Sequence, residues 1–278
     1  MVECPRDAMQ GWKTFIPTDK KIAYLNSLLQ VGFDTLDCGS FVSPKAIPQM
    51  ADTAEVLQQL TTETNTKLLV IVANTRGAEQ AVIFDNVHYL GFPFSISETF
   101  QQRNTNSSIS ESVGRVEEIQ ELCTRHNKEL VIYLSMGFGN PYGDTHNEEI
   151  LLHWADEMVR RNINSISLAD TVGVATTDQI SFALNTLIPA YPNTAFSVHL
   201  HSTAANWQHK MEAAVDAGCK RFEGALKGIG GCPMAGNDLI GNMNTEWMID
   251  YFREHNILPP INEDALRHSL HLADEIFV

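Results

Sequence analysis

The order of its apolar segments predicts a single (β/α)8 barrel for this chain of 278 residues. Eight short strand-like segments alternate with helical ones, which is the pattern of a parallel barrel. The length suits one such domain, because α/β barrels commonly take about 200–250 residues. A hydrophobic content of 44% supplies a sizeable core. No linker or change of composition divides the chain, so we expect one domain, residues 1–278, with closing helices at its C-terminal end.

The first half of the chain predicts four strands and the helices between them. Residues 67–73 (KLLVIVA) form a continuous apolar run, as expected for a parallel strand buried on both faces. Apolar residues recur at helical spacing between positions 22 and 29, and Gly32 follows that helix. The expected strands are 2–4, 35–38, 67–73 and 88–92, and the expected helices are 19–30, 46–60 and 77–84. Polar segments 5–18 and 95–110 are expected to be loops, the second a functional loop or a lid.

The second half of the chain repeats this alternation. Residues 129–134 (ELVIYL) have the length and composition of a buried strand, and residues 148–161 are amphipathic at helical spacing. The expected strands are 129–134, 165–168, 195–201 and 221–226, and the expected helices are 109–126, 148–161, 177–188, 206–217, 244–255 and 263–276. Residues 137–144 (GFGNPYGD) are rich in turn formers and predict a loop.

The charge balance excludes some classes of partner. Lys and Arg number 19 against 34 Asp and Glu, which gives a formal net charge of −15. Such an acidic chain is a poor ligand for nucleic acid or for an anionic membrane surface. A phosphorylated small molecule stays compatible with it, because a local Arg or Lys can hold one phosphate.

The cysteines and the termini indicate a compartment. Five scattered cysteines, none paired at zinc-ribbon or thioredoxin spacing, are typical of a reduced, intracellular protein. The N-terminus has no charged-then-apolar leader, and no 18-residue apolar run is present. We therefore expect a cytoplasmic protein that neither is exported nor spans a membrane.

Two histidines two residues apart predict a metal site. His199 and His201 fall within the expected strand 195–201, and alternate residues of a strand face the same side. Two protonated imidazoles so close would repel each other, whereas a shared metal ion needs both of them neutral. A hydrogen-bonded pair of structural histidines remains the alternative at this point.

Asp7 and Asn242 are the candidates for completing this site. They follow strands that become neighbours of the histidine strand when the barrel closes, so all four side chains meet at one rim. A carboxylate oxygen, two imidazole nitrogens and an amide oxygen leave room for substrate oxygens, which suits Mg²⁺ or Mn²⁺. The alternatives are a turn or capping role for Asp7 and a helix cap, near residue 244, for Asn242.

Four further residues are candidates for catalysis. Cys232 lies in a glycine-rich loop (GIGGCP), where an exposed thiol of pKa about 8 can act as an acid or a base. Arg6, if it points inward, supplies a fixed positive charge beside the metal. Asp37 and Asp170 each end an expected strand, where barrel active sites collect. The alternatives are an incidental loop cysteine and a surface ion pair between Arg6 and Asp7.

Five stretches of this chain resemble the 3-hydroxy-3-methylglutaryl-CoA lyase family. They are PRDAMQ at 5–10, SFVSPK at 40–45 with PQM at 48–50, SLADTVG at 167–173, VHLH at 198–201 and GGCP at 230–233. They occur in the family's order and at similar spacing over nearly the whole chain. The SFVSPK and GGCP stretches are specific to this family, whereas the Arg-Asp and His-x-His pairs also occur in related synthases and aldolases.

The resemblance implies a TIM-barrel, metal-dependent carbon–carbon lyase that forms acetoacetate and acetyl-CoA. It implies that Asp7, His199, His201 and Asn242 bind the divalent cation, that Arg6 stabilises an enolate and that Cys232 is the catalytic loop thiol. Asp37 stands where the family has glutamate, and Asp170 where it has aspartate. The implied partner is a small acyl-CoA, and the closing helices would suit a homodimer.

The chain also departs from the family's pattern. Ser202 replaces the family's aspartate after the second histidine, and the Thr-Tyr-Gly that follows is Thr-Ala-Ala at 203–205. The loop from Cys232 to Asn242 is one residue longer, and Asn140 stands where the family has a cysteine. These changes bear on the substrate more than on the metal. They keep two alternatives open: an aldolase or synthase of the same scaffold acting on another hydroxy- or oxo-acid, and an inactive barrel that only binds a ligand.

Overall fold

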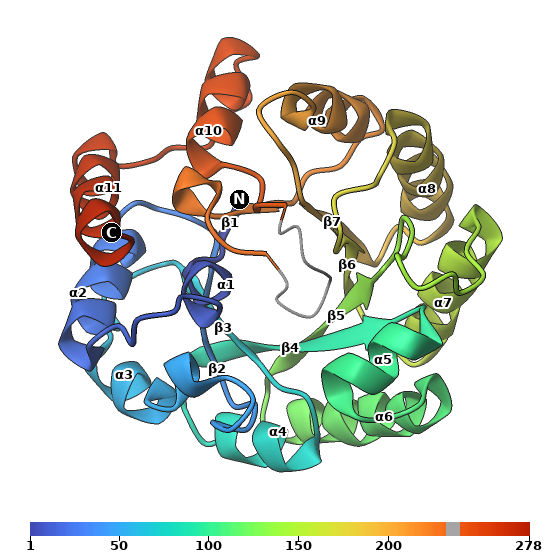
Figure 1. The fold of residues 1–278 in the computed structure, drawn as a ribbon, viewed down its shortest axis with the longest axis horizontal. Helices are drawn as coiled ribbons and strands as arrows, with labels where there is room; N and C mark the ends of the chain where they lie inside the picture. Colours follow the sequence, from blue (N-terminus) through green and yellow to red (C-terminus); the bar gives the residue numbers. More distant parts are fainter. Residues whose placement is uncertain (232–239) are drawn as a thin grey trace.

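The computed structural model describes residues 1–231 and 240–278. Within these residues eight parallel strands close into a barrel in chain order, which confirms the predicted fold (Figure 1). Strand β1 pairs with both β2 and β8, with Val2 opposite Thr35 on one side and Glu223 on the other. The strands are β1 Val2–Glu3, β2 Thr35–Ser40, β3 Lys67–Ile71, β4 Val87–Ser95, β5 Glu129–Ser135, β6 Ser165–Asp170, β7 Ala195–Leu200 and β8 Phe222–Gly224.

Helices surround the barrel, and α1 lies inside their ring, over the end of β1 (Figure 1). The helices are α1 Pro5–Gln10, α2 Thr18–Leu29, α3 Thr53–Gln59, α4 Thr75–Ala81, α5 Glu98–Thr105, α6 Ile109–Arg125, α7 Glu148–Arg160, α8 Thr177–Ala190, α9 Trp207–Asp216, α10 Thr245–Glu254 and α11 Glu263–Ile276. Two short 3-10 turns, η1 Pro48–Met50 and η2 Leu226–Gly228, complete the described elements. None of the described helices is long and apolar enough to cross a membrane.

Three predicted segments differ from the structure. Residues 5–18, expected as a loop, begin with α1, because Pro5 occupies a first-turn position where its fixed φ and missing N–H are favourable. Residues 95–110, expected as a loop or lid, contain α5, which Ser97 caps by accepting a hydrogen bond from the backbone N–H of Phe100. The helix expected over 46–60 is divided into η1 and α3, and η1 begins at position 48, because proline suits a first helical turn and cannot lie inside a helix.

The core has two parts, as the apolar strands predict. The larger cluster fills the space between the strands and the helices, where Val70, Ile132 and Leu168 are fully buried. A smaller cluster inside the barrel consists of Leu69, Ile71, Tyr89, Val131 and Tyr133. Alternate residues of the same strands therefore pack inward and outward, which leaves the C-terminal end of the barrel for polar groups.

A buried carboxyl group links β1 to η2 and α10, the elements that follow β8. Glu3 Oε1 accepts a hydrogen bond from the backbone N–H of Leu226 (2.8 Å), and Oε2 accepts one from Thr245 Oγ1 (2.6 Å). Burial raises the pKa of Glu3 from 4.5 to about 8, although both hydrogen bonds act against the rise. Glu3 therefore holds its proton in the folded protein at neutral pH.

We expect Glu3→Gln to flatten the pH dependence of stability. Between pH 4.5 and about 8 the folded protein holds a proton that the unfolded chain has released. The free energy of unfolding of the wild type therefore falls as the pH rises through this window. Glutamine cannot ionise and keeps an acceptor for Leu226, so the variant should lose less stability between these limits. Urea unfolding at several pH values measures the difference, and parallel curves for the two proteins would contradict it.

Candidate active site

Three potential metal ligands converge at the C-terminal end of the barrel. Asp7, His199 and His201 each present a ligand atom, and these atoms lie within 4.8 Å of one another. Asp7 arrives there because α1 starts directly after β1, while the histidines lie at the end of β7. The shared direction predicted for the two histidines agrees with their ring centroids, which are 5.4 Å apart.

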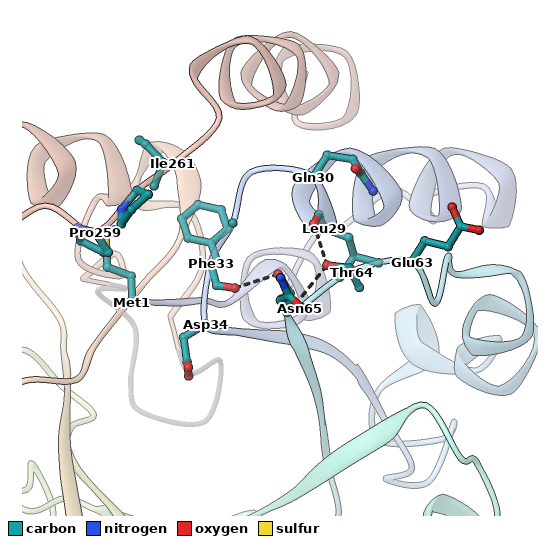
Figure 2. A pocket seen from close by; sticks show the side chains of 13 residues that line it. Met1, Leu29, Gln30, Phe33, Asp34, Glu63, Thr64, Asn65, Pro259 and Ile261 are labelled. Atoms are coloured by element: carbon teal, nitrogen blue, oxygen red, sulfur yellow. Dashed lines mark hydrogen bonds between the residues drawn. The ribbon is translucent and has the colours of Figure 1, made fainter.

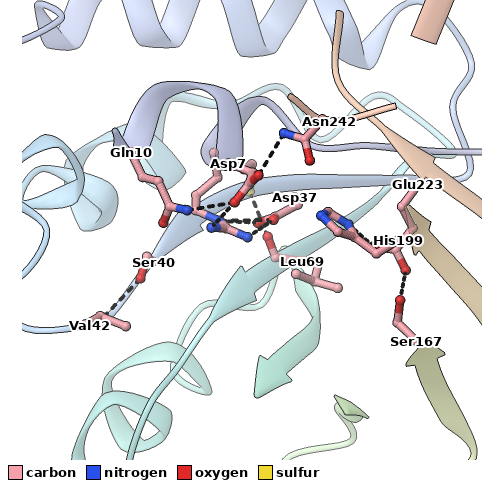
Figure 3. Close-up of polar contacts among 12 residues, drawn as sticks. Asp7, Gln10, Asp37, Ser40, Val42, Leu69, Ser167, His199, Glu223 and Asn242 are labelled. Atoms are coloured by element: carbon pink, nitrogen blue, oxygen red, sulfur yellow. Dashed lines mark hydrogen bonds and ion pairs between the residues drawn. The ribbon is translucent and has the colours of Figure 1, made fainter. Parts of the chain in front are cut away.

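Asn242 joins this group through a backbone bridge to His201. Its Nδ2 donates to Asp7 Oδ2 (2.7 Å) and to the carbonyl of Ile229 (2.9 Å), as Figure 3 shows for Asp7. Its Oδ1 is buried and is one of two such side-chain atoms that lack a hydrogen-bond partner in the described residues. The helix-cap alternative does not hold, because Asn244 caps α10 by accepting from Trp247. An unpartnered buried acceptor is costly, and a cation at this place would satisfy it.

Glu223 on β8 orients His199 and was missed by the sequence reasoning. Its Oε2 lies 3.2 Å from His199 Nδ1, which leaves the other ring nitrogen as the potential ligand atom (Figure 3). Its Oε1 accepts from Ser167 (2.7 Å) and Ser197 (2.8 Å). Carboxylates commonly hold metal-binding histidines in this way. The available signal was an acidic residue inside an expected barrel strand, since charged residues are rarely buried there without a partner.

We expect Glu223→Gln to weaken cation binding by about 10–100-fold, the usual effect of removing such an orienting carboxylate. The amide keeps the shape but loses the charge that fixes the tautomer of His199. Glu129→Gln is the matched control, because Glu129 also accepts from a strand serine, Ser165 Oγ at 2.5 Å, and does not line the site. Titration of the metal-free proteins with Mn²⁺ gives the affinities. Equal affinities for the Glu223 variant and the control would contradict the assignment.

A second set of potential ligands shares His199 and Glu223 with Cys4. The Cys4 thiol is buried, and burial together with the charges of Glu223 and Asp37 raises its pKa well above the ordinary value. Within this set, Glu223 Oε2 already lies at hydrogen-bond distance from His199 Nδ1 (3.2 Å), so two of its three members bind each other. The set with Asp7 and His201 is the better candidate.

The two histidines differ in their affinity for a proton. Burial, with a smaller effect of His199, lowers the pKa of His201 to about 3, so this imidazole is neutral as a metal ligand must be. Burial also acts against a charge on His199, but the hydrogen bond and charge of Glu223 and the charge of Asp7 outweigh it and raise its pKa. The negative charges of Glu223 and Asp7 therefore favour a positive charge at the position of His199.

Arg6 and Asp37 form a buried ion pair beside Asp7. Arg6 Nε donates to both carboxylate oxygens of Asp37, at 3.2 Å to Oδ1 and 3.0 Å to Oδ2, and Nη2 also donates to Oδ2 (2.5 Å). The remaining nitrogen, Nη1, donates to Asp7 Oδ1 (3.0 Å). Burial raises the pKa of Asp37 to about 6 although Arg6 opposes the rise. The surface-pair alternative for Arg6 is wrong. Arg6 lines the cavity and Asp37 does not, which favours a role for Asp37 in orienting the guanidinium.

The other two predicted catalytic residues, Asp170 and Cys232, are not seen to join this group. Asp170 is buried, accepts from Ala175 N–H (3.0 Å) and pairs with Lys210 (2.6 Å), while its neighbours Ala169 and Thr171 line the cavity. Its carboxylate is thus turned away from the space where a substrate would bind. Cys232, the predicted loop thiol, lies outside the described residues.

A cavity of about 260 Å³ opens beside these groups. Its polar end is formed by Arg6, Asp7, His199 and His201. Its remaining lining is largely apolar, with Gln10, Val42, Ala46, Ile47, Ile71, Ala73, Pro93, Phe100, Arg103, Asn104, Thr105, Tyr133, Ser135, Ala169 and Thr171. A short acyl group with polar oxygens at one end fits this division.

A larger hollow of about 570 Å³ lies at the opposite end of the barrel (Figure 2). Hydroxyl groups at this hollow are already used, since Thr64 donates to the carbonyl of Leu29 (2.9 Å) and Thr66 to that of Phe33 (2.7 Å). Barrel enzymes carry their active sites at the C-terminal end of the strands. We therefore place the candidate site at the smaller cavity.

The barrel and the carboxylate–imidazole–amide donor set at its rim define a class, the (β/α)8-barrel carbon–carbon lyases and their relatives. More particularly, the chain belongs to the HMGL-like family, whose model matches residues 3–272. It is 33% identical over 245 residues, 88% of this chain and 71% of the relative, to a cytoplasmic 3-hydroxy-3-methylglutaryl-CoA lyase of Rattus norvegicus. It is 30% identical over 262 residues, 94% and 87% of the two chains, to the hydroxymethylglutaryl-CoA lyase YngG of Bacillus subtilis.

Solved structures agree with this membership. An HMG-CoA lyase from Acinetobacter baumannii, in complex with coenzyme A and 3-methylmalate, superposes with a TM-score of 0.91 at 30% identity. The match covers 99% of this chain and 90% of that one. The Bacillus subtilis HMG-CoA lyase superposes with a TM-score of 0.92 at 27% identity, over 99% and 92% of the chains. The resemblance read from the five motifs is therefore confirmed.

Proposed function

We propose that this chain cleaves 3-hydroxy-3-methylglutaryl-CoA, or a related 3-hydroxyacyl-CoA, to acetoacetate and acetyl-CoA. The observation that carries the proposal is the meeting of Asp7, His199, His201 and Asn242 at one end of a cavity that also contains Arg6. The cavity's apolar wall suits the acyl group. The family membership adds the reaction class, since the curated relatives are named for this lyase activity.

We propose Mg²⁺ or Mn²⁺ as the cation held by these four residues. The donors are oxygen and nitrogen atoms, which such ions accept, and the buried Oδ1 of Asn242 needs a partner. Two carboxylates, Asp7 and Asp37, contact the guanidinium of Arg6, and a third, Glu223, contacts His199, so a divalent cation would balance negative charge that Arg6 leaves uncompensated. When bound, it would lower the pKa of a substrate hydroxyl and polarise a carbonyl oxygen.

The chain's own groups supply the other parts of the reaction. A base among the groups proposed to hold the metal takes the proton of the tertiary hydroxyl. Asp37, the other candidate that the sequence offered, has both oxygens on Arg6 and does not line the cavity. The C–C bond then breaks, and its electron pair passes to the thioester as an enolate. Arg6, fixed by Asp37, holds that negative charge. Cys232 donates the proton that converts the enolate carbon into the methyl group of acetyl-CoA.

The carrier end of the substrate would meet Arg103, a basic side chain of the cavity wall, and Lys45 lies next in the chain to Ala46, which also lines the cavity. Arg103 of α5 lines the cavity, and its guanidinium lies 4.7 Å from the ring centre of Tyr142. A guanidinium that contacts an aromatic ring still has N–H groups that can donate to a phosphate. Arg103 and Lys45 are therefore the proposed contacts for the phosphates of coenzyme A. A cytoplasmic location stays a prediction, because the named relatives include cytoplasmic and mitochondrial lyases. The homodimer is a prediction as well.

The deciding experiment measures cleavage by metal-stripped and reconstituted protein. We expect no acetoacetate after EDTA treatment, and restored cleavage of the thioester when Mg²⁺ or Mn²⁺ is added under reducing conditions. Cleavage of a free hydroxy- or oxo-acid in place of every 3-hydroxyacyl-CoA would favour the aldolase alternative. Protein that takes up no divalent metal and cleaves nothing would be the inactive barrel, and the proposal would be wrong.

A further inference from the structure

A buried lysine lies directly behind the candidate metal site. Lys210 of α9 is only 3% exposed. Its Nζ donates to Asp170 Oδ2 (2.6 Å), to the backbone carbonyl of His201 (2.8 Å) and to that of Gly173 (3.0 Å). An ammonium group has three protons, and all three are used in this arrangement.

The three acceptors belong to three separate segments of the site. Asp170 ends β6, Gly173 lies in the turn between β6 and α8, and His201 follows β7. The first two segments carry Ala169 and Thr171, which line the cavity, and the third carries a proposed metal ligand. One ammonium group therefore connects the wall of the cavity to the backbone of that ligand.

A lysine at this position costs stability in two ways, so packing alone does not explain it. It is the fourth residue of α9, near the end of the helix where the dipole disfavours a cation, and its charge is removed from water. An apolar side chain would avoid both costs. The contact with the carbonyl of His201 gives a reason for the lysine, since it fixes the backbone from which the imidazole projects.

We propose that Lys210 is a positioning residue that holds His201 and the turn after β6 in the geometry the cation requires. Asp170 then acts through Lys210 and does not contact the substrate, in contrast to the catalytic role expected from the sequence. This inference rests on the proposed metal site. Neither residue needs to change its protonation for this role.

Lys21 offers a matched control. It is 2% exposed, its Nζ lies 2.7 Å from Asp52 Oδ1, and it also donates to the carbonyl of Gln49. Neither Lys21 nor these two partners line the cavity or belong to the metal set. Replacing either lysine with methionine thus removes an equally buried charge with the same kinds of contact.

The test compares Mn²⁺ binding by metal-free wild type, Lys210→Met and Lys21→Met, with thermal unfolding measured alongside. Both substitutions should lower the unfolding temperature, because each removes the lysine partner of a carboxylate, which is buried for Asp170 and partly buried for Asp52. Only Lys210→Met should weaken Mn²⁺ binding, by about tenfold or more, as found for residues that support metal ligands. A folded Lys210→Met protein with wild-type Mn²⁺ affinity would overturn the proposal.

If Lys210→Met does not fold, the double variant Lys210→Met with Asp170→Asn removes both charges and keeps an acceptor for Ala175. The same loss of affinity is expected of it, and failure of both variants to fold would assign Lys210 to stability alone and refute the inference. Wild type that binds Mn²⁺ but cleaves no thioester would contradict the proposed function while leaving this comparison valid. Wild type that binds no Mn²⁺ would contradict both.

Discussion

Asp7→Asn is expected to abolish tight cation binding and to lower thioester cleavage by about a thousandfold or more. Asp7 is the one carboxylate of the proposed ligand set. The amide is nearly the same size but lacks the negative charge, and metal activation contributes several kcal/mol to such reactions. Each 1.36 kcal/mol corresponds to about a tenfold change in rate. The fold should survive, since the amide oxygen can still accept from Arg6 and Gln10.

Asp34→Asn is the control for this substitution. Asp34 pairs with Arg221 (2.7 Å) near the opposite end of the barrel, where it lines the larger hollow. Titration with Mn²⁺ and steady-state kinetics should show near-normal values for this variant. Tight Mn²⁺ binding by Asp7→Asn, with the control unchanged, would remove Asp7 from the metal site.

The second large effect is expected from Arg6→Lys, which should lower kcat by roughly 10²–10³-fold, as loss of a charge-stabilising donor does in other enzymes. Lysine keeps the positive charge but cannot contact both oxygens of Asp37 and Asp7 together, because it lacks the planar fork. Cation affinity should change only a few-fold, since Arg6 is not in the proposed ligand set. Single-turnover cleavage at saturating metal measures the effect.

Arg221→Lys is its control, because the Arg221 guanidinium also contacts two groups, Asp34 (2.7 Å) and Thr35 Oγ1 (2.9 Å), outside the cavity. Its cleavage rate should remain near that of the wild type. If Arg6→Lys also cleaves at the wild-type rate, the enolate charge is held by other groups and the proposed role of Arg6 is wrong.

The departures from the family's pattern have structural counterparts. Asp37 is one methylene shorter than the family's glutamate, yet it reaches Arg6 with both oxygens. Ser202, which replaces the family's aspartate, is buried, and its hydroxyl donates to Met243 Sδ (3.4 Å). Neither change removes a member of the candidate metal set, and neither residue is among those that line the candidate cavity.

Much of the fold followed from local patterns, and the errors had local causes as well. The apolar run 67–73 and the His-x-His segment were correctly predicted as strands. Residues 95–110 were expected to be a functional loop or a lid because they are polar, but the Ser97 cap and the buried Phe100 and Gln101 make residues 98–105 a helix. That helix lines the candidate cavity, so the loop was wrong while a functional role stays a prediction. Composition describes the exposed face of such a segment, whereas a few contacts decide whether it folds.

The sequence by itself determined the barrel, the family and the identities of the four proposed ligands, because strand periodicity and short motifs are written in neighbouring residues. Only the tertiary structure decided which groups support them. Glu223 and Lys210 lie 24 and 9 residues from their histidine partners, and their roles depend on strand register and on a helix packed behind the site. Which groups a buried charged side chain contacts depends on the residues packed around it in space, and the spacing of residues along the chain does not contain that information.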